Sequence, residues 1–164
     1  MSRGDDRLTQ ALAAASADLL AYLQRRVGPG DAPDLLGETM VIAWRRVGDL
    51  PRDPEQARMW LFGIARGTLL NHARGERRRW ALSDRIRGHA ATDAAAPPAD
   101  AGIEVRDAIG RLEPDLAELV RLVHWERLTL VQAADLLGIP DSTARSRYQR
   151  AKEQLRAALG VAVA

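Results

Sequence analysis

Residues 129–156, TLVQAADLLGIPDSTARSRYQRAKEQLR, contain the clearest structural pattern in this chain. Thr129 can cap a short helix whose apolar residues recur at helical spacing, and Gly138 ends that helix. A proline-containing turn follows, after which Asp141 or Ser142 is expected to cap a second, longer helix. The pattern therefore predicts a helix-turn-helix.

The second helix of this motif is strongly basic, and its cationic residues are Arg145, Arg147, Arg150, Lys152 and Arg156. A cationic helix that follows such a turn is the form that enters the major groove of DNA. The alternative is an ordinary helical hairpin with a solvated basic face. The agreement between the turn residues and the placement of the charges favours DNA binding.

The composition of the chain indicates an all-α protein. Of the 164 residues 46% are apolar, but alanine inflates this value, and runs that could form strands are nearly absent. Residues 88–102 (GHAATDAAAPPADAG) are small, polar and proline-containing, which is typical of a flexible linker. We therefore expect two small helical domains, residues 1–87 and 103–164, with the helix-turn-helix in the second.

Helix start and stop signals predict the elements of both domains. In the first domain, a helix over 7–27 ends at Gly28-Pro29-Gly30, and Asp31 opens a second helix. Asp53-Pro54, a capping acid followed by proline, begins a third helix that leads into a basic run at 74–79. In the second domain four helices are expected: 103–112, 115–126, 129–137 and 142–159.

The basic residues are concentrated in two blocks, although the net charge of the whole chain is only +2. Residues 60–92 carry seven arginines against two acids, and residues 141–164 carry five basic residues against two acids. Such blocks indicate two separate contacts with a polyanion. Two DNA-binding domains on a flexible tether can reach two separated sites on one duplex.

Several classes of protein are disfavoured. The chain has no cysteine, so disulfides and Cys-ligated metals are excluded, and its three histidines lack ligand-spaced partners, so no metal site or other cofactor is expected. No leader-like or membrane-spanning segment is evident, which predicts a cytoplasmic protein. No phosphate loop, GxSxG motif or paired-carboxylate pattern occurs, so we predict no enzyme activity; a basic nuclease or recombinase is the enzymatic alternative.

Two further stretches, DAPDLLGETMVIAWRR (31–46) and WLFGIARGTLLNHARGERRR (60–79), complete a pattern with the helix-turn-helix. In this order, and across a linker, the three stretches resemble the two-domain extracytoplasmic-function (ECF) sigma factors of bacterial RNA polymerase. The resemblance covers about residues 7–82 and 103–159. It implies a non-catalytic subunit that binds core polymerase and directs it to a promoter with upstream (−35) and downstream (−10) elements.

The first stretch is similar to the helix with which the family docks on a coiled coil of the polymerase's largest subunit. Asp34 and Glu38 lie four residues apart, so they share one helix face. The resemblance assigns both to the docking contact, with Leu35 and Trp44 helping to set the helix. The alternative is a solvated acidic face. The family often has glutamine where this chain has Gly37, and glycine inside a helix costs about 1 kcal/mol relative to alanine.

The second stretch is similar to the helix with which the family recognises and melts the −10 element. In the family, the loop before this helix, here about residues 49–57, captures a base flipped out of the non-template strand. Asn71 is a candidate for a base contact, whereas arginines neutralise phosphates. Trp60 is expected in the core, and Gly67 replaces an asparagine that is common in the family. The predicted contact residues are Arg66, Asn71, Arg74, Arg77, Arg78 and Arg79.

The helix-turn-helix is similar to the family's module that reads the −35 element. Four residues occupy positions that the family uses there: Arg145, Ser146, Gln149 and Arg150. Arginine can pair with guanine and glutamine with adenine. The predicted phosphate contacts are Thr143, Arg147 and Lys152. Tyr148 and Leu155 are expected to point into the core.

The resemblance implies two partners, promoter DNA and core RNA polymerase, the latter through the coiled coil of its largest subunit and its flap. Family members are often held inactive by an anti-sigma protein wedged between the domains, and the predicted linker permits this. One copy suffices for such a subunit, whereas a repressor usually dimerises on a palindrome. The alternatives are a stand-alone helix-turn-helix regulator that binds an operator without polymerase, and an adaptor that uses its acidic face without touching DNA.

Overall fold

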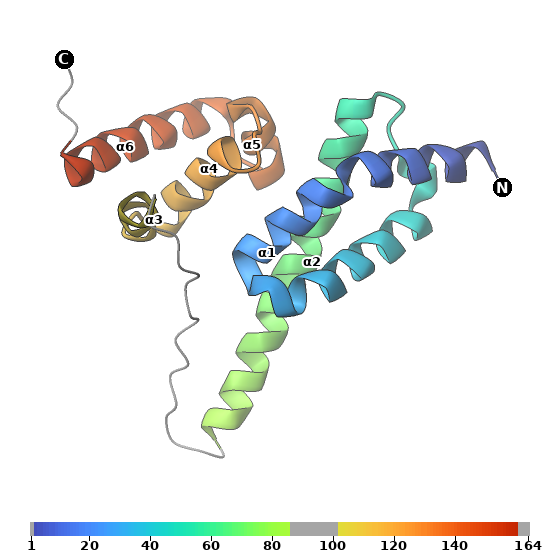
Figure 1. The fold of residues 1–164 in the computed structure, drawn as a ribbon, viewed down its shortest axis with the longest axis horizontal. Helices are drawn as coiled ribbons and strands as arrows, with labels where there is room; N and C mark the ends of the chain where they lie inside the picture. The colour runs from blue at the N-terminus through green and yellow to red at the C-terminus, as the bar shows by residue number, and fades with distance from the viewer. Residues whose placement is uncertain (1, 86–101, 161–164) are drawn as a thin grey trace. The chain divides into compact units, whose positions relative to one another are not determined.

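The computed structural model describes residues 2–85 and 102–160, and within these ranges the chain forms helices joined by turns, without strands. The chain divides into two compact units (Figure 1). The first unit spans residues 1–92 and the second residues 93–164. The all-α prediction with two helical domains is confirmed. The predicted linker, 88–102, lies outside the described residues apart from Gly102, so the predicted domain boundaries stay predictions.

The first unit begins with a long helix, α1 (Arg3–Arg45), which is sharply bent at Gly28. Gly28 has φ 82° and ψ 171°, a conformation that side-chain-bearing residues rarely adopt, so the predicted break is confirmed. The two legs of α1 fold back on one another (Figure 1). The prediction that Asp31 opens the second leg is wrong, because the helix resumes immediately at Pro29, which is favourable at a first helical position. Asp31 Oδ2 instead lies 3.6 Å from Nε2 of His72, which belongs to the next long helix.

The 3₁₀-helix η1 (Val47–Asp49) and a short loop lead into α2 (Pro54–Asp84), which packs against both legs of α1. As predicted, the carboxylate of Asp53 caps α2 by accepting a hydrogen bond from the Gln56 amide at 2.9 Å. Leucines of α1 and α2 fill the core around Tyr22 and Phe62, whose rings meet edge to face at 5.4 Å. This core packs α2 against the bent α1.

The second unit contains four helices, α3 (Ile103–Gly110), α4 (Pro114–His124), α5 (Leu130–Leu137) and α6 (Asp141–Leu159). These bounds agree with the predicted ranges to within two residues. The core is formed by α3, α4 and α6, and its buried members are Ile109, Leu112, Leu116, Ala117, Val120 and Ala151. The unit therefore has an apolar core of its own.

The helix-turn-helix is formed by α5 and α6. Thr129 and Gln132 make the predicted start of α5 through a reciprocal capping box, and Gly138 ends it with φ 67°. The prediction that Asp141 or Ser142 caps α6 is wrong, because extended Pro140 is the N-cap and Asp141 is already helical. Asp141 lies in the first turn of α6, where its negative charge interacts favourably with the positive end of the helix dipole.

Candidate nucleic-acid interface

The polar face of α6 is exposed to solvent because the opposite face of this helix packs against the other helices of the second unit. Ala144 and Ala151 of α6, together with Ala133 and Ala134 of α5, are completely buried, and their small side chains let the helices approach closely. The predicted base-reading residues are all exposed: Arg145, Ser146, Gln149 and Arg150. The predicted phosphate contacts are half-buried: Thr143, Arg147 and Lys152. Four of the seven predicted residues are thus exposed on α6, and the other three are partly exposed.

Two arginines of α6 are engaged by acids at the start of α4, a contact that sequence reasoning missed. Arg150 Nη2 lies 2.6 Å from Glu113 Oε1, and Arg147 Nη1 lies 3.4 Å from Asp115 Oδ2. The Arg150–Glu113 pair is more than half exposed on both sides, so the attraction is weak and DNA can displace it. Within residues 102–160, no ion pair holds Arg145, which leaves its guanidinium available to a ligand.

Tyr148 was predicted in the core, but the structure places it half-buried at the edge of the second unit. Its hydroxyl lies 2.8 Å from His124 Nε2 at the end of α4, and the two rings stack at 5.9 Å between centroids. The ammonium group of Lys152 lies 5.1 Å from the Tyr148 ring centroid. Leu155 packs against the core as predicted. These contacts tie the middle of α6 to α4 and so set its orientation in the unit.

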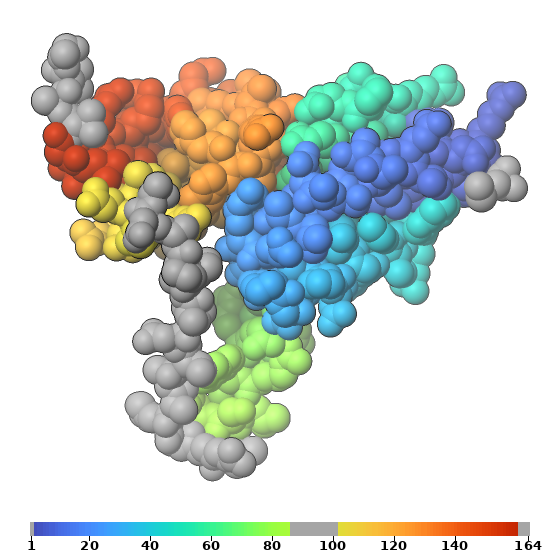
Figure 2. All heavy atoms as spheres, viewed as in Figure 1, coloured from blue at the N-terminus to red at the C-terminus, as the bar shows by residue number. Residues whose placement is uncertain are grey.

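The basic residues of α2 between 74 and 79 lie toward the end of the helix that extends beyond α1 (Figure 2). Its predicted contact residues Asn71, Arg74, Arg77, Arg78 and Arg79 are exposed, and Arg66, nearer the core, is half-buried. Arg79 pairs with Glu76, one turn away on the same helix. Sequence reasoning missed Trp80, which is 47% exposed beside these cations. An aromatic residue directly after a basic run is a signal that could have identified it, because bases stack on exposed aromatic rings.

The predicted docking residues lie on the second leg of α1. Asp34 and Glu38 are exposed one turn apart, and we call this pair the acidic face. Leu35 is buried and holds this leg against the core, whereas Trp44, predicted to help set the helix, is 40% exposed. Trp60, predicted in the core, is half-buried, with the Arg46 guanidinium 5.7 Å from its ring centroid.

Two buried threonines join the acidic leg of α1 to α2, and sequence reasoning missed both. Thr39 donates to the Leu35 carbonyl at 2.8 Å, and Thr68 donates to the Ile64 carbonyl at 3.1 Å. Their hydroxyl oxygens lie 3.4 Å apart, so the two helices approach closely here with both polar groups satisfied. The acidic leg therefore packs directly against the helix that carries the basic residues.

Two negative findings apply to the part of the chain that the structure describes. No group of three or more histidine and acidic side chains is arranged to hold a metal ion. No helix there is both long enough and apolar enough to cross a membrane.

Comparison with known proteins assigns both units to one class. The model of the Sigma-70 region 2 family matches residues 13–79, and that of Sigma-70, region 4 matches residues 103–155. Among solved structures, the sigma factor RpoE of Bartonella quintana, in complex with the anti-sigma factor NepR, is similar with a TM-score of 0.68 and 24% identity over 97% of this chain and 98% of that one. CnrH, in complex with the cytosolic domain of CnrY, is similar with a TM-score of 0.63 and 22% identity over 97% and 91%. These two likenesses concern the fold.

Curated relatives narrow the class. The ECF RNA polymerase sigma factor SigC of Mycobacterium tuberculosis is 30% identical over 161 residues, which are 95% of this chain and 85% of the relative. SigM of Bacillus subtilis is 25% identical over 130 residues, 77% and 78% of the two chains. The chain belongs to the family of ECF RNA polymerase sigma factors. It directs transcription initiation together with RNA polymerase and is not an enzyme, which sets aside the stand-alone regulator, adaptor and nuclease alternatives.

Proposed function

We propose that this sigma factor reads a promoter at two points, with α6 on the upstream (−35) element and α2 with the loop before it on the downstream (−10) element. The observation that carries this proposal is the presence of two exposed basic surfaces on two separate compact units. Base reading at the upstream element falls to Arg145, Ser146, Gln149 and Arg150, with phosphate contacts from Thr143, Arg147 and Lys152. At the downstream element Asn71 contacts a base, and the arginines between 66 and 79 neutralise phosphates.

The acidic face of α1 docks on the coiled coil of the polymerase's largest subunit, and the second unit contacts the flap. Asp34 and Glu38 support this assignment because both are exposed, while buried Leu35 and the Thr39–Thr68 contact fix the leg that carries them. The sigma factor RpoE has been solved with the anti-sigma factor NepR, and CnrH with the cytosolic domain of CnrY. We propose that an anti-sigma factor likewise controls this chain.

The experiment that tests the proposal is transcription by purified core polymerase, with and without this chain, on genomic fragments that include its own upstream region. A discrete transcript that depends on the chain is expected, and its start identifies the promoter. Loss of transcription when either element of that promoter is scrambled would support reading at two points. A transcript that tolerates scrambling of the −35 element would contradict the role of α6.

The docking assignment is tested by the double substitution Asp34→Lys and Glu38→Lys. Reversing both charges is expected to abolish co-elution with core polymerase, while the second unit keeps its affinity for −35 duplex DNA. The matched control is Glu104→Lys with Asp107→Lys, which changes the charge equally on exposed positions of α3. Polymerase binding that survives reversal of the acidic face would remove the docking assignment.

A further inference from the structure

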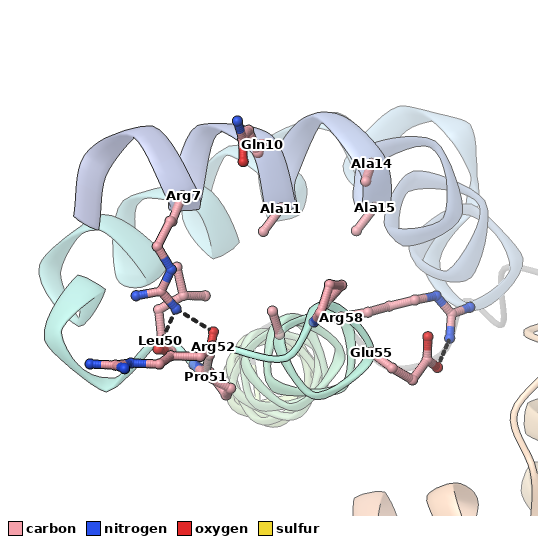
Figure 3. A pocket seen from close by; sticks show the side chains of 12 residues that line it. Arg7, Gln10, Ala11, Ala14, Ala15, Leu50, Pro51, Arg52, Glu55 and Arg58 are labelled. Atoms are coloured by element: carbon pink, nitrogen blue, oxygen red, sulfur yellow. Dashed lines mark hydrogen bonds and ion pairs between the residues drawn. The ribbon is translucent and has the colours of Figure 1, made fainter. Parts of the chain in front are cut away.

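The loop between η1 and α2 has little packing to hold its shape. Leu50 is buried at its start, but Arg52 and Asp53 are exposed, as are residues 54–56 in the first turn of α2. The part of α1 that faces the loop carries the small side chains Ala11, Ala14 and Ala15, and an open cavity of about 410 Å³ separates them from it (Figure 3). Because alanines contribute few contacts across this gap, packing against this part of α1 does little to set the backbone conformation at the start of the loop.

Arg7, on the first leg of α1, makes the direct connection to this loop. Its Nη2 donates to the backbone carbonyl of Leu50 at 3.2 Å and to that of Pro51 at 2.6 Å (Figure 3). Charged donors make hydrogen bonds about twice as strong as neutral ones. Within residues 2–85 no carboxylate forms an ion pair with the half-buried Arg7, so its charge is directed at the two carbonyls.

We propose that Arg7 is a positioning residue for reading the downstream promoter element. By orienting the carbonyls of Leu50 and Pro51, it holds the start of the loop in the conformation that presents residues 52–56, the end of the loop and the first turn of α2, to an unpaired base. Arg7 itself touches no DNA in this scheme and acts through the loop. The inference rests on the proposed role of the loop at the −10 element, and it adds a residue from the beginning of α1, before the part that matches Sigma-70 region 2.

The test uses the full-length chain bound to core polymerase and a fluorescent single-stranded oligonucleotide with the non-template −10 sequence of its own promoter. Affinity is measured for this probe and for a set of probes with one base changed at each position. For wild type, a change at the base read by the loop is expected to weaken binding. In Arg7→Met that discrimination should fall about tenfold, in line with the loss of hydrogen bonds from a charged donor.

Three readouts separate positioning from a general structural role. Discrimination at the other bases, affinity for core polymerase and discrimination of the −35 element should all be unchanged in Arg7→Met. Arg7→Lys retains a charged donor and should recover part of the lost discrimination. The matched control Arg3→Met removes one positive charge from an exposed position of the same helix and should behave as wild type.

The failures are distinguishable. If wild type shows no discrimination at any base, the proposed role of the loop fails and this inference with it. If wild type discriminates and Arg7→Met does so equally, the inference alone is overturned. It is also overturned if Arg7→Met loses polymerase binding together with base discrimination, because Arg7 would then support the fold of the whole unit.

Discussion

Glycine occupies two different kinds of position in the first unit. At Gly28 the positive φ is required for the bend of α1, so the missing side chain serves the fold. Gly37 and Gly67 lie inside helices with ordinary backbone angles, and a Cβ atom at either position would meet nothing within 4 Å. Packing therefore explains neither of the two departures from the family pattern, and glycine there costs helix stability.

Gly37→Ala is accordingly expected to raise the free energy of unfolding of the first unit by about 1 kcal/mol, because alanine is the better helix former. The matched change Gly28→Ala should lower it by roughly 1–3 kcal/mol, because the bend places the new side chain in a strained conformation. Hydrogen exchange of the α1 core amides in the full chain measures both. Equal effects of the two substitutions would contradict this distinction between the glycines.

On α6, Arg145 and Arg150 are both assigned to bases. Arg150 is paired with Glu113, whereas no ion pair within residues 102–160 holds Arg145. Arg145→Ala or Arg150→Ala should reduce discrimination of the upstream element by roughly 1–3 kcal/mol, measured as relative affinities for single-base variants of that element. Arg156→Ala, further along the same helix, serves as the control and should weaken all sequences alike. An unchanged sequence preference in either of the first two variants would refute base reading by that residue.

At the scale of elements, the start of α4 and the middle of α6 are electrostatically coupled. Glu113 and Asp115 occupy two arginines that the proposed function assigns to DNA. When DNA takes Arg150 from Glu113, one counterion leaves the DNA but the freed carboxylate attracts another. The contact therefore reduces both the affinity for DNA and the dependence of that affinity on salt.

Glu113→Gln is expected to raise the affinity for −35 duplex DNA by about two- to fivefold at low salt, in keeping with the strength of an exposed ion pair. The slope of log K against log salt concentration should become steeper by up to about 0.9. Glu113 makes no side-chain capping bond to α4, so the helix should remain intact. Glu104→Gln on α3 changes the net charge equally and is the control. An identical effect of this control would show that the gain in affinity comes from net charge and not from the contact between Glu113 and Arg150.

At the scale of the whole molecule, each unit has its own buried core. Leu116→Ala removes a side chain that is 1% exposed in the second unit and should destabilise that unit by about 2–5 kcal/mol. Binding to the −35 element should fall with the folded fraction, while amide protection in α1 and α2 stays at the wild-type level. Val131→Ala, at a position 52% exposed, should have little effect. Lost protection in α1 would show that the units unfold together.

The bend at Gly28, the start of α2 at Asp53 and the end of α5 at Gly138 could all be predicted from the sequence, because caps and glycines act on their immediate neighbours. Errors arose where two local signals competed. Pro29 begins the second leg of α1 before Asp31, and Pro140 takes the capping position expected of Asp141 or Ser142. The candidate contact residues were chosen because three stretches of the sequence resemble the sigma-factor family, and their roles stay predictions.

Contacts between distant parts of the chain could be known only after folding. Arg7 meets the carbonyls of the loop, Arg150 meets Glu113, and Tyr148 meets His124, across separations of 44, 37 and 24 residues. No periodicity or capping rule relates such partners, because their distance depends on how whole helices pack. Local sequence thus sets where helices begin, bend and end, whereas packing sets which cations are engaged and which face DNA, since ion pairs and hydrogen bonds act only over a few ångströms.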